Sequence, residues 1–514
     1  MGIFLYKDII MFNKILVANR GEIAFRILRA CKDLNIKTVG IYSEADKSSL
    51  PLKYFDEIFS FNSSELNETY LNIENIIDIA LKSNCDAIHP GYGFLSENKN
   101  FVKKCNEAGI IFIGPNSKAM ANLGDKVNAK KLTNKLGISN IPGSSTIVKN
   151  IKDAFKIASD IGFPLIIKAA GGGGGRGMRL VKTVDELENV FEISKSESKA
   201  AFGNANVYFE KYIEDAKHIE VQILGDKYGN LVHFFERDCT IQRKYQKLIE
   251  EAPAYGIKNN IKEKIWKSAI QLAEYTKYDN IGTIEFLLDK NGDHYFMESN
   301  TRIQVEHPIT EMITGFDLVK EQIKVAYGKE ITYNQKDIKI NGHAIECRIY
   351  AEDPWNNFMP SPGKINSYVS PGGYGIRIDS AVYEGYEISS YYDTLISKVI
   401  AWGKNRKEAL SRMKSALEEY QIIGITNTKS LHLGILNDLN FKNNNFDTRY
   451  LESHINDLLP PQHDEFKFII SAVLNEHLNK SKFSSIRQNF MSSSQNSRKK
   501  RIGDAWNTWR KKSR

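Results

Sequence analysis

The chain has 514 residues, of which 42% are hydrophobic and 26% charged, with a formal net charge of +8. This length predicts about three domains with a large buried core, and the composition is that of an ordinary globular protein without a membrane span. Its five cysteines are scattered without a Cys-x-x-Cys pair, which argues against a disulfide framework or a zinc site and favours a reducing compartment such as the cytoplasm.

The first part of the chain alternates hydrophobic runs with amphipathic stretches, after a short extension in which Met11 is an alternative start. The pattern predicts strands at 14–19, 38–43, 86–90 and 109–115, and helices at 21–34 and 97–108. Strands that alternate with helices are typical of a parallel sheet, so we expect a Rossmann-like α/β domain over residues 12–125. The motif Gly-x-Gly-x-x-Gly is missing, and no dinucleotide is expected.

The central region contains a glycine-rich loop between two predicted strands. Residues 163–181 predict strand, loop and strand, with Lys168 at the end of the first strand. The loop consists of Gly171, Gly172, Gly173, Gly174, Gly175, Arg176 and Gly177. Successive glycines let backbone N–H groups close over phosphate oxygens. A Walker loop needs Gly-Lys-Ser/Thr and then a helix, so this pattern favours a flexible hairpin lid, with a plain connector as the alternative.

Further periodic segments surround this loop. They predict helices at 126–136, 151–161, 260–277 and 315–327, and strands at 207–213, 218–224, 231–236, 283–289 and 294–300. The pairs Gly229-Asn230 and Asn291-Gly292 predict turns that join neighbouring strands into hairpins.

Polar side chains recur at every second position just after the second hairpin turn. They are Glu298, Asn300, Arg302, Gln304 and Glu306. Alternate side chains of an extended chain share one face, and a packed core would not tolerate so polar a face. Glu285 lies on the preceding strand and is expected beside Glu298. Two carboxylates and an amide are oxygen ligands suited to Mg²⁺, whereas the alternative is an exposed surface hairpin.

Basic residues and a second glycine motif complete the pattern. Lys126, Lys168, Lys211 and Lys247 lie near the ends of predicted elements, where a single lysine is usually solvated. Together with the glycine loop and the acidic cluster they indicate ATP handling through Mg²⁺. Around Tyr92, two glycines allow the backbone to approach a ligand closely, or simply form a turn.

The last part of the chain predicts a mixed α+β domain followed by a basic tail. Strands are expected at 342–351, 364–369, 375–379 and 394–402, and helices at 406–420 and 464–479. Residues 466–514 hold 12 lysines and arginines against two acids, a net charge of +10, so the remainder carries −2. Such a tail can bind nucleic acid, a membrane surface or an acidic partner, but its composition favours a solvated, partly disordered segment over 460–514.

Several longer motifs occur between about residues 12 and 455. They include ILVANRGEIAFRI, AIHPGYGFLSEN, GDKVNAK, IIKAAGGGGGRGMR, ERDCTIQRKYQK, NTRIQVEHPITEMITG, ECRIYAED and PSPGKI. Together these motifs resemble the biotin carboxylase subunit or domain of acetyl-CoA, propionyl-CoA and pyruvate carboxylases. The resemblance implies an α/β ATP-grasp enzyme. Its expected parts are a Rossmann-like N-terminal domain (12–125), an ATP-grasp region (126–330) with a mobile β-rich lid at about 141–213, and an α+β C-terminal domain (340–455).

The resemblance also implies a role for each matching residue. ATP is expected among Lys126, Lys168, Gly171–Gly177, Glu210, Lys211, Ile213, His218, Gln242, Glu285, Leu287 and Glu298, with Mg²⁺ or Mn²⁺ at Glu285, Glu298 and Asn300. Bicarbonate is expected at the catalytic residues Lys247 and Arg302, with Gln304 and Val305, and Glu306 would deprotonate it. Arg348 would stabilise the biotin enolate, with Tyr92 near the ureido ring. Tyr245 and Ser299 depart from the family pattern, which usually has His and Met or Val there.

The implied reaction is ATP-dependent carboxylation of biotin by bicarbonate through carboxyphosphate. The biotinylation motif Ala-Met-Lys-Met is missing, so the biotinyl carrier protein and the carboxyltransferase are expected as separate chains, around a homodimer of this one.

The acceptor of the carboxyl group is expected to be acetyl-CoA or propionyl-CoA, with pyruvate as the alternative. A carbamoyl-phosphate synthetase half is disfavoured by ECRIYAED and PSPGKI. Membrane binding is not expected, and nucleic-acid binding through the tail would be a second role at most.

Overall fold

The computed structural model describes residues 11–144, 146–169, 178–460 and 473–476, and it divides into one unit up to Leu458 and a second from Leu459. In the second unit residues 473–476 are helical, and the rest of the helix predicted at 464–479 lies outside the described residues. The glycine loop at 171–177 and most of the basic tail also lie outside them. Over the described part of the chain, we find no helix long and apolar enough to cross a membrane.

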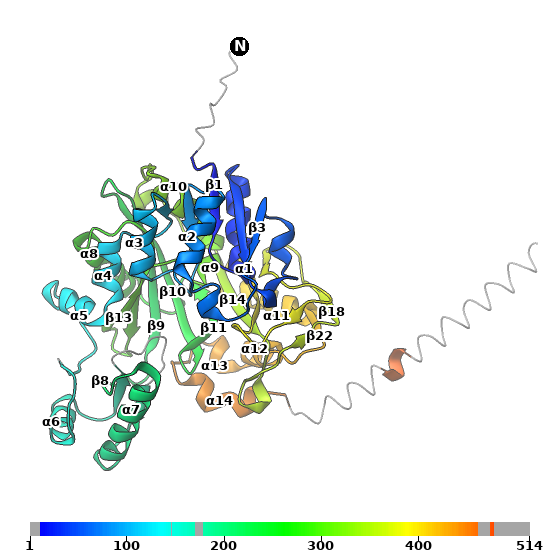
Figure 1. The fold of residues 1–514 in the computed structure, drawn as a ribbon. Helices are drawn as coiled ribbons and strands as arrows, with labels where there is room; N and C mark the ends of the chain where they lie inside the picture. The colour runs from blue at the N-terminus through cyan, green and yellow to red at the C-terminus, as the bar shows by residue number, and fades with distance from the viewer. Residues whose placement is uncertain (1–10, 145, 170–177, 461–472, 477–514) are drawn as a thin grey trace, which may run out of the picture. The chain divides into compact units, whose positions relative to one another are not determined.

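A parallel sheet forms the N-terminal layer of the first unit (Figure 1). Its strand order is β3-β2-β1-β4-β5, and every neighbouring pair is parallel. The elements are β1 (Lys14–Val17), α1 (Gly21–Asp33), β2 (Lys37–Tyr42), β3 (Glu57–Ser60), α2 (Ile73–Lys82), β4 (Ala87–His89), α3 (Lys99–Glu107) and β5 (Ile111–Phe112). The predicted Rossmann-like architecture is confirmed. The prediction missed β3 and α2, although Asn72 caps α2 and Ile76, Ile77 and Ala80 form its buried stripe.

A large antiparallel sheet of order β13-β12-β9-β10-β11-β14-β21-β19 forms the centre. Its strands are β9 (Lys217–Gly225), β10 (Leu231–Arg243), β11 (Gln246–Ala252), β12 (Asn280–Leu288), β13 (His294–Asn300), β14 (His343–Tyr350), β19 (Ile376–Ser380) and β21 (Leu395–Gly403). Two helices pack on this sheet. The helix α8 (Asn259–Tyr275) packs on β9 and β10, and α9 (His307–Thr314) packs on β11, β14 and β21. Three of the four strands expected in the C-terminal region, at 342–351, 375–379 and 394–402, correspond to β14, β19 and β21 of this sheet.

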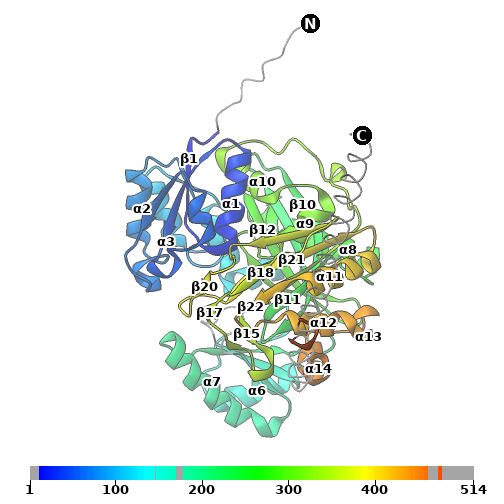
Figure 2. The same ribbon diagram turned by 90° about the vertical axis from the view of Figure 1, so that its right-hand side faces the viewer.

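A small three-stranded sheet lies at the opposite end of the unit from β1 in both views (Figures 1 and 2). Its elements are α6 (Ile151–Ile161), β6 (Leu165–Ala169), β7 (Met178–Val181), α7 (Leu187–Phe202) and β8 (Val207–Lys211). Phe191 and Phe209 are fully buried at the centre of its own hydrophobic core. The glycine loop joins β6 to β7, which pair antiparallel as predicted.

Further helices and short strands complete the unit, and the short strands pair into two-stranded sheets. They are α4 (Ser117–Gly124), α5 (Lys126–Lys135), α10 (Leu318–Tyr327), β15 (Glu352–Asp353), β16 (Met359–Pro360), β17 (Gly363–Lys364), β18 (Ser367–Val369), β20 (Glu387–Ile388), α11 (Arg406–Glu419), β22 (Gln421–Ile423), α12 (Lys429–Asn437), α13 (Leu439–Lys442) and α14 (Tyr450–Leu458).

Three strand predictions were wrong in extent. The strand expected at 109–115 is only β5, Ile111–Phe112. The strand expected at 364–369 is divided between β17 and β18, because Ile365 N–H donates to Tyr386 O and Asn366 N–H donates to Ile423 O, so the backbone changes partners. The strand expected at 231–236 continues to Arg243 and forms a hairpin with β11. Buried polar residues such as Arg237 interrupt the hydrophobic pattern after residue 236, so the pattern does not predict that the strand continues.

A buried ion cluster ties the central sheet to α11. The Glu251 carboxylate accepts hydrogen bonds from Arg406 Nε at 2.6 Å and Nη2 at 2.8 Å, and His343 Nε2 lies 2.9 Å away. Burial alone would raise the pKa of Glu251, but hydrogen bonds from Arg406 and His343 lower it to about 2. A carboxyl pKa lowered by folding stabilises the protein fully above the unfolded value of about 4.5, and the stabilisation is lost as the pH falls towards 2.

We expect Glu251→Gln to lower the free energy of unfolding by about 3 kcal/mol at pH 7, because the Arg406 guanidinium would remain buried without its counter-charge. The difference in the free energy of unfolding between this variant and the wild type should become smaller below about pH 4.5. Urea unfolding followed by circular dichroism at pH 7 and pH 4 measures both effects. Equal stability of the two proteins at pH 7 would show that the cluster does not stabilise the fold.

Candidate active site

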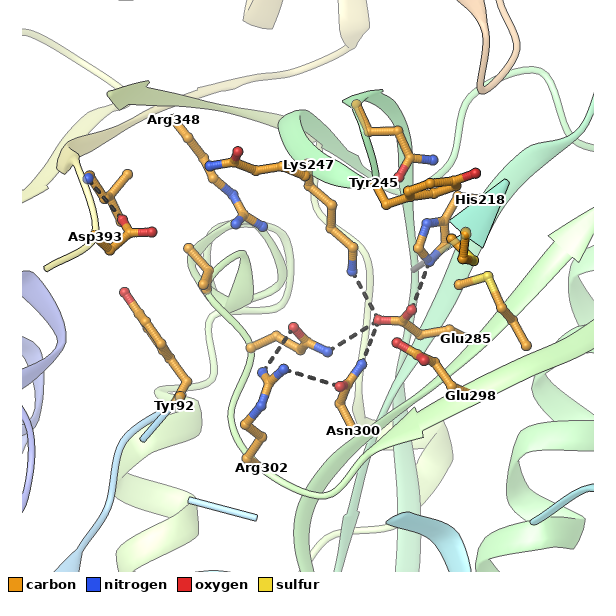
Figure 3. Close-up of a pocket in the computed structure, with 18 of the residues that line it drawn as sticks. Tyr92, His218, Tyr245, Lys247, Glu285, Glu298, Asn300, Arg302, Arg348 and Asp393 are labelled. Carbon is orange, nitrogen blue, oxygen red and sulfur yellow. Dashed lines mark hydrogen bonds and ion pairs between the residues drawn. The ribbon is translucent and has the colours of Figure 1, made fainter. Parts of the chain in front are cut away.

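A cavity of about 620 Å³ opens between the N-terminal layer, the small sheet and the central sheet. The predicted site residues that line it are Tyr92, Lys168, Glu210, Lys211, Ile213, His218, Gln242, Lys247, Glu285, Leu287, Glu298, Asn300, Arg302, Gln304, Val305 and Arg348. The glycine loop and the side chain of Lys126 lie outside the described part of the structure. Figure 3 shows His218, Tyr245, Glu285 and Glu298 at one end, with Tyr92, Asp393 and Arg348 at the other.

The acidic end of the cavity is built by the β12–β13 hairpin. Glu285 and Glu298 are directly opposite each other in its register, as the turn at Asn291-Gly292 predicted. Glu285 Oε1 accepts hydrogen bonds from Asn300 Nδ2 at 2.7 Å and Lys247 Nζ at 2.9 Å, and its Oε2 lies 3.0 Å from His218 Nε2 (Figure 3). Burial alone would raise the pKa of Glu285, but Lys247 and His218 hold it far below its usual value.

The segment after β13 was predicted to be extended as far as Glu306, and this is wrong. The strand ends at Asn300, the chain bends at Arg302, and Glu306 is the N-cap of α9, which has a proline in its first turn. A proline is favoured there because the first turn needs no N–H donor, so the sequence starts a helix where the alternation suggested a strand.

The polar side chains nevertheless converge. Arg302 Nη2 donates to Asn300 Oδ1 at 3.0 Å and its Nη1 donates to Gln304 Oε1 at 3.2 Å. Gln304 Nε2 in turn donates to Glu285 Oε1 at 3.2 Å. We call Arg302, Gln304 and Val305 the anion clamp, because they present a guanidinium fork and an amide to the cavity next to the carboxylate pair.

Glu306 is fully buried and, among the described residues, is not part of the cavity lining. Its carboxylate lies behind the wall, with Oε1 2.7 Å from Lys247 Nζ and Oε2 2.9 Å from Arg348 Nη2. Burial alone would raise the pKa of Glu306, but Lys247, Arg348 and Arg237 hold it well below its usual value. Burial alone would lower the pKa of Lys247, but its acidic neighbours raise this pKa well above the usual value of a lysine. The three groups therefore form a charged cluster at neutral pH.

Two lysines meet one buried carboxylate on the side of the small sheet. Lys168 and Lys130 both form ion pairs with Glu210, which lies on β8. Lys211 Nζ instead donates to the backbone carbonyl of Phe163 at 2.8 Å. Lys130 lines the cavity and was not predicted as a site residue. Its position four residues after Lys126, on the same face of α5, was the available signal.

Other residues that shape the site were also missed. Glu97 accepts hydrogen bonds from Arg302 Nε at 3.0 Å and from the Thr301 N–H at 2.9 Å. On β9, Glu220 pairs with the fully buried Arg237 at 2.5 Å and with Lys247 Nζ at 2.6 Å. The strand carries the signal for Glu220, because polar His218, Glu220 and Gln222 alternate with apolar Ile219, Val221 and Ile223.

The donor set fits a divalent cation that prefers oxygen. Glu285, Glu298 and Asn300 face the cavity from one hairpin (Figure 3) and offer carboxylate and amide oxygens. Two other groups of potential ligands lie deeper, His218 with Glu220 and Glu285, and Glu220 with Cys239 and Glu306. Glu220 and Glu306 are not among the described residues that line the cavity, whereas all three hairpin residues are, so the hairpin end suits a cation better. The cavity thus combines a cation site with lysines and an arginine suited to anionic ligands.

Three family models match consecutive parts of the chain. The model described as the biotin carboxylase N-terminal domain matches residues 11–120, and that of the biotin carboxylase C-terminal domain matches 346–453. Between them, the model for the carbamoyl-phosphate synthase L chain ATP-binding domain matches 125–334.

Known proteins resemble the chain over most of its length. Biotin carboxylase 1 of Bacillus subtilis is 50% identical over 445 residues, which are 86% of this chain and 99% of that protein. One subunit of the pyruvate carboxylase of Methanothermobacter thermautotrophicus is 50% identical over 444 residues, 86% of this chain and 90% of that protein. The biotin carboxylase domain of Hydrogenobacter thermophilus 2-oxoglutarate carboxylase, solved as a dimer with MgADP, ADP and bicarbonate, has a TM-score of 0.84 and 48% identity, covering 88% of this chain and all of that one.

Proposed function

The chain belongs to the biotin carboxylase family and is the biotin carboxylase subunit of a biotin-dependent carboxylase, and from this premise we propose how its cavity carries out the reaction. ATP and bicarbonate react in the cavity, and the carboxyl group passes to a biotin carried on a separate protein. The observation that supports this most is the juxtaposition of the Glu285–Glu298 pair with the anion clamp and with Lys247.

The nucleotide occupies the end of the cavity lined by Lys168, Glu210, His218 and Gln242, with its phosphates towards Glu285 and Glu298. Glu285, Glu298 and Asn300 hold Mg²⁺ or Mn²⁺, which supplies neutralisation of the phosphate charge when bound. Lys168 and Lys130 bring positive charge to the same end. We include Lys126 and the lid at 171–177 in this site from the resemblance alone.

Bicarbonate binds at the anion clamp and Lys247. There it lies next to the Lys247–Glu306–Arg348 cluster, which contains a buried carboxylate. Glu306 takes the bicarbonate proton, and the resulting oxyanion attacks the γ-phosphorus of ATP, so that carboxyphosphate forms and ADP leaves. Arg302 and Lys247 stabilise the developing negative charge. A general base must first lie within hydrogen-bond reach of the proton that it takes, directly or through one water.

Biotin enters at the opposite end, near Tyr92 and Arg348 (Figure 3). Carboxyphosphate breaks down to CO₂ and phosphate, and the phosphate takes the N1′ proton of biotin. The Arg348 guanidinium stabilises the enolate oxygen, and N1′ attacks CO₂ to give carboxybiotin. Closure of the lid over the cavity would keep water from carboxyphosphate.

The acceptor of the carboxyl group is acetyl-CoA or propionyl-CoA in our proposal. Pyruvate is the second candidate, favoured by the similarity to the pyruvate carboxylase of Methanothermobacter thermautotrophicus. A biotinyl carrier protein and a carboxyltransferase would complete the complex around a homodimer. Assaying the purified complex with each acceptor separates these alternatives, since the acceptor meets the transferase and not this cavity.

Purified protein should release ADP in a bicarbonate-dependent manner, and the rate should rise when free biotin or a biotinyl carrier protein is added. A coupled assay for ADP with and without bicarbonate measures this. ADP release that is indifferent to both bicarbonate and biotin would contradict the proposed function.

The basic tail offers the competing hypothesis of a protein that acts mainly by binding a partner. The cavity and all elements that line it belong to the unit that ends at Leu458. We therefore expect a chain truncated after Pro460 to keep ADP release with free biotin within about two-fold of the full chain, because its catalytic groups are unchanged. A loss of more than ten-fold in a folded truncation would make the tail part of the catalytic unit.

A further inference from the structure

Lys398 is a fully buried lysine on β21 that contacts three separate segments of the chain. Its ammonium donates to the Val305 carbonyl oxygen at 2.9 Å. The same nitrogen lies 3.1 Å from Glu22 Oε2 on α1 and 3.7 Å from Asp379 Oδ2 on β19. An ammonium buried so completely is tolerated only when charges and hydrogen bonds compensate its lost hydration, and here carboxylates and a carbonyl do so.

The sheet register places Lys398 next to a residue of the active site. On β14 its direct neighbour is Arg348, and on β19 it is Asp379. Residues opposite each other on neighbouring strands share one face, so Lys398 and Arg348 project to the same side. Lys398 is nevertheless not among the described residues that line the cavity, so it acts through its neighbours.

Two of these neighbours, Val305 and Glu22, line the cavity. Val305 lies in the turn between Gln304 of the anion clamp and Glu306 at the start of α9. Glu22 accepts a hydrogen bond from the Tyr92 hydroxyl. One ammonium therefore contacts both the backbone of the clamp and the partner of Tyr92.

We propose that Lys398 is a positioning residue that fixes the anion clamp through the Val305 carbonyl and fixes Tyr92 through Glu22. This inference rests on the proposed function in one respect, namely that the clamp binds bicarbonate. Without Lys398, the turn at Val305 loses its anchor, and the clamp side chains no longer converge on one anion.

The test is Lys398→Met, which keeps the length of the side chain but removes the charge and the donors. The KM for bicarbonate should rise at least about 10-fold, since displacements of about 1 Å in a positioning group have effects of this size or larger. The KM for ATP should stay within about two-fold, because the nucleotide end does not contact Lys398. A merely structural role would reduce the amount of folded enzyme and leave the KM for bicarbonate unchanged.

Lys262→Met is a matched control. Lys262 is also a buried lysine, and its Nζ donates to the Ala254 carbonyl at 2.6 Å and pairs with Glu236 at 2.8 Å, outside the cavity lining of the described residues. It should lower the thermal stability in a similar way while the KM for bicarbonate stays within about two-fold. Equal rises in the KM for bicarbonate in both variants would overturn the assignment.

If Lys398→Met does not fold, the double variant Lys398→Met, Glu22→Gln is used instead. The second substitution removes the Glu22 carboxylate, which would otherwise remain without its partner Lys398. This double variant should be more stable than Lys398→Met, and its KM for bicarbonate should remain raised. A KM within about two-fold of wild type in a folded variant overturns the inference. Wild-type enzyme without bicarbonate-dependent ADP release would instead overturn the proposed function itself, so the two failures are distinguishable.

Discussion

Replacing Glu306 with glutamine should reduce bicarbonate-dependent ADP release by about 100- to 10,000-fold, the usual contribution of a general base. The carboxylate is fully buried between Lys247 Nζ at 2.7 Å and Arg348 Nη2 at 2.9 Å. Glutamine has nearly the same shape but cannot accept the bicarbonate proton, and it leaves two cations without their shared counter-charge. Initial rates of ADP formation at saturating ATP and bicarbonate measure the loss.

ATP binding should survive in Glu306→Gln, because Glu306 lies outside the nucleotide end of the cavity. Equilibrium binding of a fluorescent ATP analogue would check this. Glu251→Gln is the matched control, since Glu251 is equally buried and paired with Arg406, yet it does not line the cavity in the described structure. It should lose stability but retain turnover within about three-fold. Full activity in folded Glu306→Gln would exclude Glu306 as the base.

Glu298→Gln should raise the Mg²⁺ concentration required for half-maximal activity by at least about 10-fold and lower the maximal rate. Glu298 stands opposite Glu285 in the β12–β13 register, and both face the cavity. Removing one of two carboxylates halves the negative charge offered to the cation. A titration of ADP release against free Mg²⁺ at fixed ATP gives both quantities.

Asp289→Asn provides the control on the same hairpin. Asp289 follows β12 at the turn, where its carboxylate accepts hydrogen bonds from the Asn291 and Asp293 N–H groups at 2.9 Å, away from the cavity. This variant should respond to Mg²⁺ like wild type. Superimposable Mg²⁺ titrations for Glu298→Gln and wild type would place the cation elsewhere.

The local parts of the site could be predicted from the sequence, because turn chemistry and strand periodicity are encoded within a few residues. Asn291-Gly292 fixed the hairpin, and the hairpin register set Glu285 opposite Glu298. The same reasoning failed beyond Asn300, where the first turn of α9 overrides the alternation. Arg302 and Gln304 still reach the predicted position, but through a bend that hydrogen bonds to Glu97 and Glu285 hold in place.

Supporting residues such as Lys398 and Glu97 could not be predicted, because their partners are remote in the sequence. Lys398 on β21 contacts Glu22 on α1, near the other end of the chain, and Glu97 meets Arg302 across 205 positions. Such contacts follow from how the N-terminal layer meets the central sheet, and no single motif encodes that arrangement. Burial of Glu306 behind the cavity wall has the same origin, since it depends on Lys247 from β11 and Arg348 from β14.

Transfer of label from radioactive bicarbonate to biotin tests the central claim most directly. The purified protein would be incubated with ATP, Mg²⁺, free biotin and labelled bicarbonate, and the biotin fraction isolated under basic conditions. We expect ATP-dependent label in biotin that is released as CO₂ on acidification, in step with the ADP formed. Steady ADP formation by folded wild-type protein with no label in biotin would contradict the account.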